Sequence, residues 1–173
     1  MLSLTATEES VLGDNTERMS AGLINLGKLD IGAADRIMTT FQEVAPDFFR
    51  YIAEFQFGDL YSRPALDLRS RLIAAIAGLT ALGTAQPQLK FHINAALNNG
   101  CCRSEVVEII MQMAATAGFP AAFNSLLVVK EVFAERDARE FDTQAPDHRQ
   151  DADKTIGSCH RTVNDKRIIE DAG

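Results

Sequence analysis

The feature that most restricts the fold is a helical repeat of apolar residues, which runs with short interruptions from about residue 30 to residue 135. Apolar side chains recur at spacings of three and four, the period that lines one face of an α-helix. Strict alternation of apolar and polar residues, which marks a half-buried strand, is not sustained anywhere in this region. We therefore predict an all-α domain of about six helices.

Glycines, prolines and capping residues divide this repeat into separate helices. The clearest case is the segment after Asp67, a good N-cap residue, which continues to a Gly83 that suits a helix C-terminus. A weaker pattern near the N-terminus predicts one further helix over residues 17–26. The main predicted helices span residues 30–44, 46–58, 68–82, 87–100, 104–118 and a last segment that begins at residue 120.

The composition excludes several classes of protein. The 173 residues carry a formal net charge of −7 with no basic run, so we expect no nucleic-acid partner and no anionic membrane surface. No apolar stretch approaches the roughly 20 residues of a membrane span, and the first ten residues lack a secretory pattern. The three cysteines, Cys101, Cys102 and Cys159, include no C-x-x-C spacing. This usage favours a reducing, cytoplasmic compartment without a disulfide framework or a metal site.

Charge density separates a main domain, residues 1–136, from a C-terminal tail, residues 137–173. The tail holds 15 charged residues in 37 and has no sustained apolar period. It is either a disordered, solubilising extension or a strap docked on a neighbouring subunit. In the second case its anchors are Ile156, Val163, Ile168 and Ile169.

His92 is the most informative single residue. It follows Leu89 by three positions and precedes Ala96 by four, so it shares the inward face of its predicted helix. A histidine there needs hydrogen-bond partners, and its near-neutral pKa suits it to proton transfer. The alternative is a purely structural histidine, and we assign no role to His148 or His160 in the tail.

Three arginines flank the predicted helix 68–82, namely Arg63, Arg69 and Arg71. A guanidinium suits carboxylate binding because its planar fork makes two parallel hydrogen bonds, although solvated surface charges remain the alternative. Arg63 precedes a proline, which restricts its backbone geometry. Asp59, four residues before Arg63, is positioned to pair with it or to handle a proton. The Cys101–Cys102 pair has no base at a suitable spacing, which favours a structural role.

Two blocks of sequence are more specific than the helical pattern. The first is FGDLYSRPAL over residues 57–66, followed by RSRLI over residues 69–73; the second is FHINAALNNG over residues 91–100, with AGFPAA over residues 117–122. In these blocks the chain resembles the carboxymuconolactone decarboxylase family, and most closely its 4-carboxymuconolactone decarboxylase branch. The likeness spans about residues 21–135.

The resemblance implies an AhpD-like helical bundle that assembles as a homo-oligomeric ring, a trimer or a hexamer. It also implies a carboxy-lyase of aromatic catabolism that removes CO2 from a carboxylated lactone without a cofactor. By the same resemblance, His92 and Asp59 are catalytic, and Arg63, Arg69 and Arg71 bind substrate. The related peroxidases carry a C-x-x-C where this chain has Ala85 and Gln88, so thiol peroxidase chemistry is not expected.

The first block departs from the branch at three positions. Asp59 replaces the usual glutamate, and Phe57 and Tyr61 replace tryptophans. Two alternatives therefore stay open. One is a cyclase or isomerase of the same fold that acts on another lactone or a polyketide-like acid, and the other is a non-catalytic assembly protein.

Overall fold

A computed structural model describes residues 6–144, with side chains over residues 16–141, and all regular structure in that range is helical. The absence of strands there confirms the all-α prediction. The elements are α1 (Ala6–Leu29), α2 (Ala33–Phe41), α3 (Phe48–Tyr51), the π-helical segment η1 (Ile52–Leu60), α4 (Leu68–Leu82), α5 (Gln86–Asn98), α6 (Arg103–Ala117) and α7 (Phe119–Gln144).

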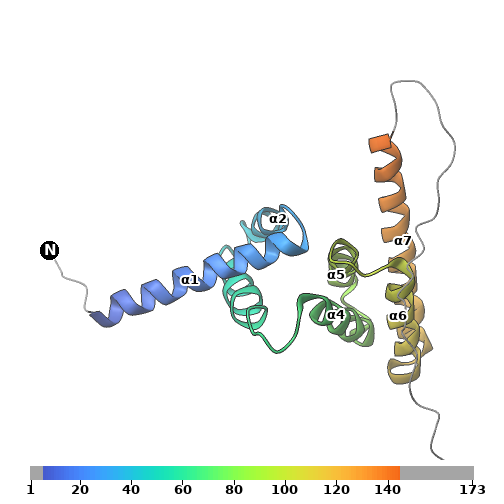
Figure 1. Ribbon diagram of the computed structural model, residues 1–173, viewed down its shortest axis with the longest axis horizontal. Coiled ribbons are helices and arrows are strands. Elements are labelled where there is room, and N and C mark those ends of the chain that lie inside the picture. Colours follow the sequence, from blue (N-terminus) through green and yellow to red (C-terminus); the bar gives the residue numbers. More distant parts are fainter. Residues whose placement is uncertain (1–5, 145–173) are drawn as a thin grey trace, which may run out of the picture.

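The helices form two parts joined by a linker, residues 61–67 (Figure 1). The first part, which we call the arm, consists of α1, α2, α3 and η1. The second, the bundle, consists of α4 to α7. The two parts meet where the end of α1 reaches α5: the amide groups of Asn98 and Asn99 donate to the carbonyls of Leu29 (3.0 Å) and Lys28 (2.9 Å). Leu26, Leu29, Ala33 and Phe57 of the arm belong to the same cluster of buried apolar residues as the bundle core, so the apolar core is continuous across the two parts.

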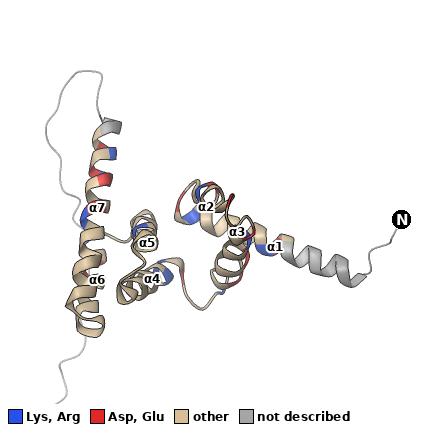
Figure 2. Ribbon diagram, turned by 180° about the vertical axis from the view of Figure 1, so that it is seen from behind, with Lys and Arg blue, Asp and Glu red and all other residues tan. Residues whose placement is uncertain are grey.

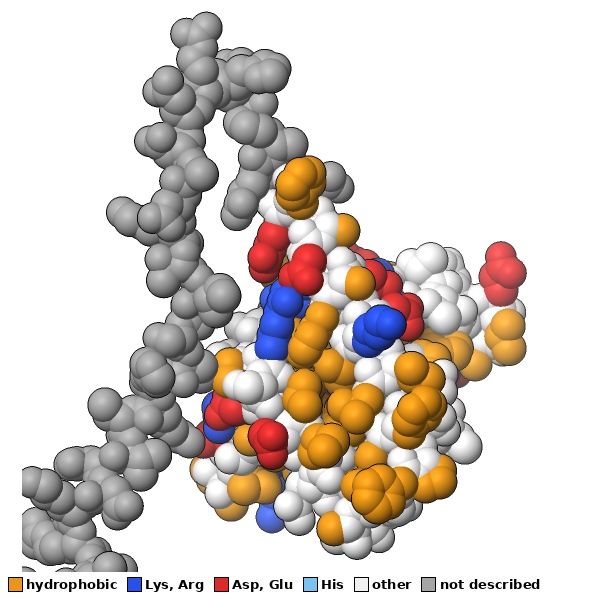
Figure 3. Space-filling model, turned by 90° about the vertical axis from the view of Figure 1, so that its right-hand side faces the viewer, with side chains coloured by type: hydrophobic (Ala, Val, Ile, Leu, Met, Phe, Trp, Pro, Cys, Tyr) orange, Lys and Arg blue, Asp and Glu red, His pale blue; other side chains and the backbone are white. Residues whose placement is uncertain are grey.

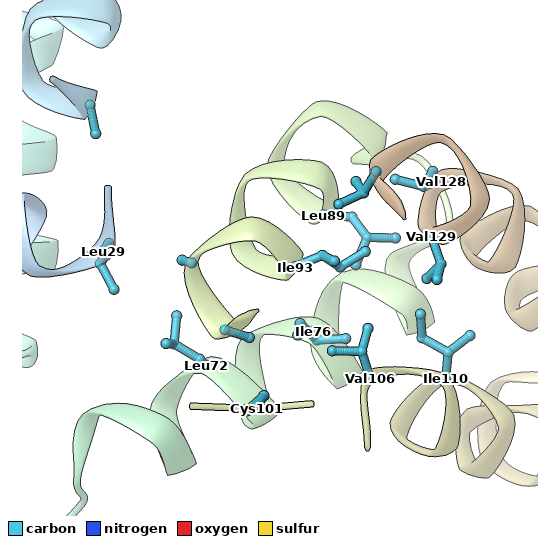
Figure 4. Close-up of a cluster of buried hydrophobic side chains, with 14 of the residues drawn as sticks. Leu29, Leu72, Ile76, Leu89, Ile93, Cys101, Val106, Ile110, Val128 and Val129 are labelled. Atoms are coloured by element: carbon cyan, nitrogen blue, oxygen red, sulfur yellow. The ribbon is translucent and has the colours of Figure 1, made fainter. Parts of the chain in front are cut away.

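The bundle buries a continuous apolar core, to which all four of its helices contribute (Figure 4). Its buried side chains include Leu72, Ile76, Leu89, Ile93, Val106, Ile110, Val128 and Val129. The predicted bounds of the helix 68–82 are confirmed by its caps. The Asp67 carboxylate accepts a hydrogen bond from the Ser70 amide at 2.6 Å, and Gly83 ends the helix with a φ of 68°. Positive φ is favourable for glycine because it has no Cβ.

The arm is held by an unusually close approach of α1 and η1. A Cβ at Gly22 would lie 2.1 Å from the Ala53 carbonyl oxygen, and one at Gly58 would lie 2.5 Å from the Arg18 carbonyl oxygen. The prediction that Gly58 ends its helix is therefore wrong. This glycine permits the close backbone packing of η1 against α1, and helical structure continues to Leu60.

Other helix boundaries in the arm also differ from prediction. α1 extends over Ala6–Leu29 rather than residues 17–26, because tertiary contacts of residues such as Leu26 supplement a weak sequence pattern. α2 is shorter than predicted, since Gly32 precedes it in a left-handed conformation and a turn follows Phe41.

The end of the described chain differs from the sequence pattern as well. The N-cap of α6 is Cys102 rather than Ser104, since the Glu105 carboxylate accepts a hydrogen bond from the Cys102 amide at 3.0 Å. α7 continues past residue 137 to Gln144. Residues 145–173, which hold most of the predicted tail with Cys159 and both tail histidines, lie outside the described residues. None of the described helices combines the length and apolar character needed to cross a lipid bilayer.

Candidate active site

His92 lies on α5 with only 8% of its surface exposed, as its inward position in the sequence predicts. Its Nδ1 is 2.8 Å from the carbonyl oxygen of Gln88, one helical turn earlier. Since a carbonyl oxygen only accepts, Nδ1 carries the hydrogen, and in the neutral ring Nε2 holds the lone pair. Burial lowers the pKa of His92, although the Gln88 hydrogen bond opposes that effect. The ring is thus oriented, and its Nε2 has the protonation state of a base near neutral pH.

Arg63 lies on the linker, where its side chain is exposed. Its guanidinium makes no hydrogen bond or ion pair with any residue whose side chain the structure describes. The main chain here is restricted by Pro64, which disfavours helical geometry at Arg63. An exposed guanidinium without a protein partner is available to a carboxylate ligand.

Arg71, on the first turns of α4, faces the same linker. Its Nη2 donates to the Arg63 carbonyl at 2.7 Å, and its Nε donates to the Leu66 carbonyl at 3.2 Å. Its guanidinium carbon also lies 5.7 Å from the centre of the Tyr61 ring. Arg71 is therefore engaged by the protein itself.

Arg69 forms an ion pair with Glu105 at the start of α6. Glu105 also accepts the hydrogen bond from the Cys102 amide, which completes a capping box. The backbone hydrogen bond from Cys102 and the guanidinium of Arg69 together lower the pKa of Glu105 to about 2. This arrangement joins α4 to α6 through charge and hydrogen bonding.

Asp59 does not pair with Arg63 but with Arg18 of α1. The contact is bidentate: Nε of Arg18 donates to Oδ1 at 2.9 Å, and Nη2 donates to Oδ2 at 2.7 Å. The hydrogen bonds from Arg18 lower the pKa of Asp59. The partner lies 41 residues away along the chain, so no local sequence signal identifies Arg18, and our reading of the sequence missed it.

The described hydrogen bonds and ion pairs do not join His92 to Asp59 or to the three arginines. A cleft of about 680 Å³ lies elsewhere, between the arm, α5 and α7. Its lining includes Asn94, Asn98 and Arg136 but none of the predicted site residues. No three histidine, cysteine or acidic side chains within the described range lie close enough to hold a metal ion.

The cysteine pair has the environment expected of structural residues. Cys101 is buried and unpaired, and burial raises the pKa of its thiol. The Cys102 sulfur lies 3.0 Å from the Ser104 hydroxyl at the start of α6. A high thiol pKa disfavours the nucleophilic thiolate.

Comparison with known proteins adds evidence of a different kind. The model of the family described as "Carboxymuconolactone decarboxylase family" matches residues 46–131. A 4-carboxymuconolactone decarboxylase from Acinetobacter baylyi is 33% identical over 99 residues, which is 57% of this chain and 73% of that protein. The chain belongs to the carboxymuconolactone decarboxylase family. This confirms the family resemblance seen in the sequence.

Two further relatives of this family member show how varied the similar proteins are. An uncharacterised 15.0 kDa protein from Paracoccus denitrificans is 33% identical, with 58% of this chain and 75% of the relative covered. A nitrosuccinic acid decarboxylase from Metarhizium robertsii is 29% identical, with 46% and 55% covered. Of these three relatives, the Acinetobacter and Metarhizium proteins have a named activity, and each is a decarboxylase.

The family match contains the linker and His92 but excludes α1. It runs from Pro46, before α3, to Glu131 in α7. All five predicted site residues therefore lie within it, whereas Arg18, the partner of Asp59, lies outside. The region common to the family carries the candidate chemistry, and α1 supplies a partner to it.

Proposed function

We propose that this family member is a cofactor-independent carboxy-lyase that acts on a carboxylated lactone, with 4-carboxymuconolactone as the first substrate to test. Two named relatives are decarboxylases, and one acts by its name on this lactone. Within the chain, the main support is His92, whose buried ring is oriented by Gln88 with Nε2 unengaged by any described residue.

The chemistry needs one proton and no redox partner. The bond between the leaving carboxylate and the ring carbon breaks, CO2 departs, and the electron pair passes through the double bond to the lactone carbonyl. The resulting dienolate takes a proton on carbon, so one carboxylate is exchanged for one C–H bond. Protein groups lower this barrier by orienting the carboxylates and stabilising the oxyanion.

We assign the proton transfer to His92. When protonated, Nε2 donates to the dienolate carbon, and a positioned acid or base of this kind contributes on the order of 10²–10⁴ in rate. Because burial lowers the pKa of His92, a substrate carboxylate beside the ring is needed to favour the imidazolium. Arg63 holds a substrate carboxylate in this scheme, since its guanidinium has no described partner.

The other predicted residues take supporting positions in the same scheme. Asp59, through Arg18, joins η1 to α1 beside the linker. Arg69, through Glu105, joins α4 to α6. The unpaired, buried Cys101 fits the reducing environment of the cytoplasm, where we place the enzyme.

A homo-oligomer, a trimer or a hexamer, is part of this proposal. Residues 109–129, at the end of α6 and the start of α7, include no charged side chain, although several of their apolar side chains are exposed. Hydrophobic side chains gather on one face of this region (Figure 3). Its large exposed members are Met111, Phe119, Phe123 and Leu127. An apolar face of this kind supports contact with another copy of the chain.

The test is CO2 release from 4-carboxymuconolactone by the purified full chain. We expect turnover by the wild type and a loss of about 10²-fold or more in His92→Ala and Arg63→Ala, with helical content and oligomeric state unchanged. Arg63→Lys keeps the charge but not the fork, so it should retain partial activity. Wild-type rates in purified His92→Ala would show that the assignment is wrong.

A panel of substrates separates the remaining functions. If the wild type leaves 4-carboxymuconolactone intact but rearranges another lactone or polyketide-like acid without releasing CO2, the cyclase or isomerase alternative replaces the decarboxylase. If His92→Ala and Arg63→Ala alter only assembly and no acid of the panel is turned over, the assembly alternative is favoured.

A further inference from the structure

We infer that Arg71 is a positioning residue that holds the linker so that the Arg63 guanidinium is presented to the substrate, a role that rests on the proposed function of Arg63. The alternative predicted from sequence is that Arg71 itself binds a carboxylate. The two roles make different demands on the donors of its guanidinium, and the contacts of Arg71 favour the first.

The donors of Arg71 are directed at main-chain carbonyls on both sides of the linker turn. Nη2 reaches the carbonyl of Arg63 at 2.7 Å, and Nε reaches the carbonyl of Leu66 at 3.2 Å. These two carbonyls enclose Pro64 and Ala65. A planar guanidinium makes both contacts at once from one rigid group, whereas an ammonium offers a single point of charge.

A third contact fixes the other end of the linker. The Arg71 guanidinium carbon lies 5.7 Å from the centre of the Tyr61 ring, and that ring packs against Phe57 with centroids 4.9 Å apart. Phe57 is buried in η1. Arg71 thus connects the first turns of α4, across the linker, to the aromatic end of η1.

The arm contributes a separate anchor to the same segment. The side-chain amide of Asn25, on α1, donates to the Ser62 hydroxyl at 3.1 Å and to the Phe57 carbonyl at 2.8 Å. The Arg63 amide makes only a long hydrogen bond, 3.4 Å, to the Leu60 carbonyl. Between Ser62 and Asp67, which is fixed by its cap on α4, the linker therefore depends mainly on Arg71 for its position.

This dependence predicts a specific consequence for Arg63. Its side chain has no partner of its own among the described residues, so the main chain at residues 63 and 64 sets the position and direction of the Cα–Cβ bond from which the guanidinium extends. Without the contacts of Arg71, that main chain gains freedom, and substrate binding must then order it again. The expected defect is in substrate affinity more than in the chemical step.

The experiment compares Arg71→Lys and Arg71→Ala with Arg103→Lys as the matched control. Arg103 also combines an ion pair, with Asp137, and a ring contact, with Phe133 at 4.9 Å, but it lies in the bundle away from the linker. Hydrogen–deuterium exchange of peptic peptides covering residues 61–67 gives a readout independent of activity. We expect exchange there to rise on the order of tenfold in both Arg71 variants and to stay unchanged in Arg103→Lys.

Kinetics then connect the linker to Arg63. In Arg71→Lys we expect KM to rise about tenfold with kcat nearly unchanged, because lost binding order acts on the ground state and the transition state alike. In an Arg63→Ala background, Arg71→Lys should raise KM little further, because the effects of two residues that act through one another are not additive. Unchanged linker exchange, or an Arg71→Lys effect that adds in full to that of Arg63→Ala, would overturn the inference.

One outcome distinguishes this inference from the proposed function. If linker exchange rises in the Arg71 variants while Arg63→Ala keeps wild-type turnover, Arg63 does not bind substrate and the proposed function of that residue fails. The same result still supports Arg71 as the group that holds the linker in place.

Discussion

At the scale of single residues, what a side chain does here depends on the backbone beside it. His92 has one described hydrogen bond, to the Gln88 carbonyl, and that bond determines which ring nitrogen carries the hydrogen. Gly22 shows the same dependence although it has no side chain. Only glycine fits there, because the Ala53 carbonyl lies where a Cβ would otherwise be.

We predict that Gly22→Ala destabilises the protein by roughly 1–3 kcal/mol, because the added methyl group meets backbone rather than a side chain that is able to move. Gly27→Ala is the matched control on the same helix, where a Cβ meets no atom within 4 Å. For Gly27→Ala we expect the free energy of unfolding to rise by about 0.5–1 kcal/mol, because alanine stabilises a helix interior more than glycine does. Denaturant unfolding at equal protein concentration measures both, and equal effects would contradict the close packing of α1 and η1.

At the scale of elements, capping decides where the bundle helices begin. α4 begins where Asp67 predicts, since its cap is local in sequence. α6 is capped by Cys102 rather than by Ser104, and Glu105 of that helix has two partners, the Cys102 amide within the capping box and Arg69 from α4. The first partner follows from sequence spacing, but the second depends on the packing of α4 against α6.

The low pKa of Glu105 makes a prediction about pH. Its pKa of about 2 in the folded chain is below the ordinary value near 4.5, so the ionised carboxylate stabilises the fold above pH 4.5. That contribution is lost as the pH falls towards 2. We expect Glu105→Gln to lower the free energy of unfolding by about 1 kcal/mol at pH 7 and by progressively less below pH 4.5.

Denaturant unfolding from pH 7 to pH 3 tests this, with Glu108→Gln as the control. Glu108 lies on the same helix and is exposed, and the structure gives it no described partner. A comparable loss at Glu108, or a Glu105→Gln effect that does not shrink in acid, would contradict the assigned role of the Arg69–Glu105 pair.

At the scale of the whole molecule, the arm extends beside the bundle (Figure 1), and one cluster of buried apolar residues includes side chains of both. Charged residues occur on the arm, on α4 and α5 and towards the far end of α7, whereas residues 109–129, at the end of α6 and the start of α7, include none (Figure 2). Phe119, Phe123 and Leu127 form a stripe at a spacing of four along α7. This distribution is typical of a surface that is covered in an assembly.

We predict that Phe123→Glu reduces the oligomeric state, because it places a charge in the centre of this stripe, where Phe123 is 64% exposed in the single chain. The same substitution at Phe141, which is exposed on the far end of the same helix, is the matched control and should leave the assembly intact. Sedimentation velocity measures the oligomeric state of the wild type and of both variants. A wild-type chain that sediments as a monomer would contradict the proposed oligomer directly.

The sequence by itself determined the helical class, the limits of α4, the inward position of His92 and the family, because each depends on spacing along one segment or on short local motifs. Tertiary structure alone decided that Asp59 pairs with Arg18, that Arg71 holds the linker carbonyls, and that α1 approaches η1 through Gly22. These are contacts between segments far apart in the chain or between side chains and a folded loop. Periodicity within one helix identifies which face is buried, but the partner of that face depends on how the helices pack.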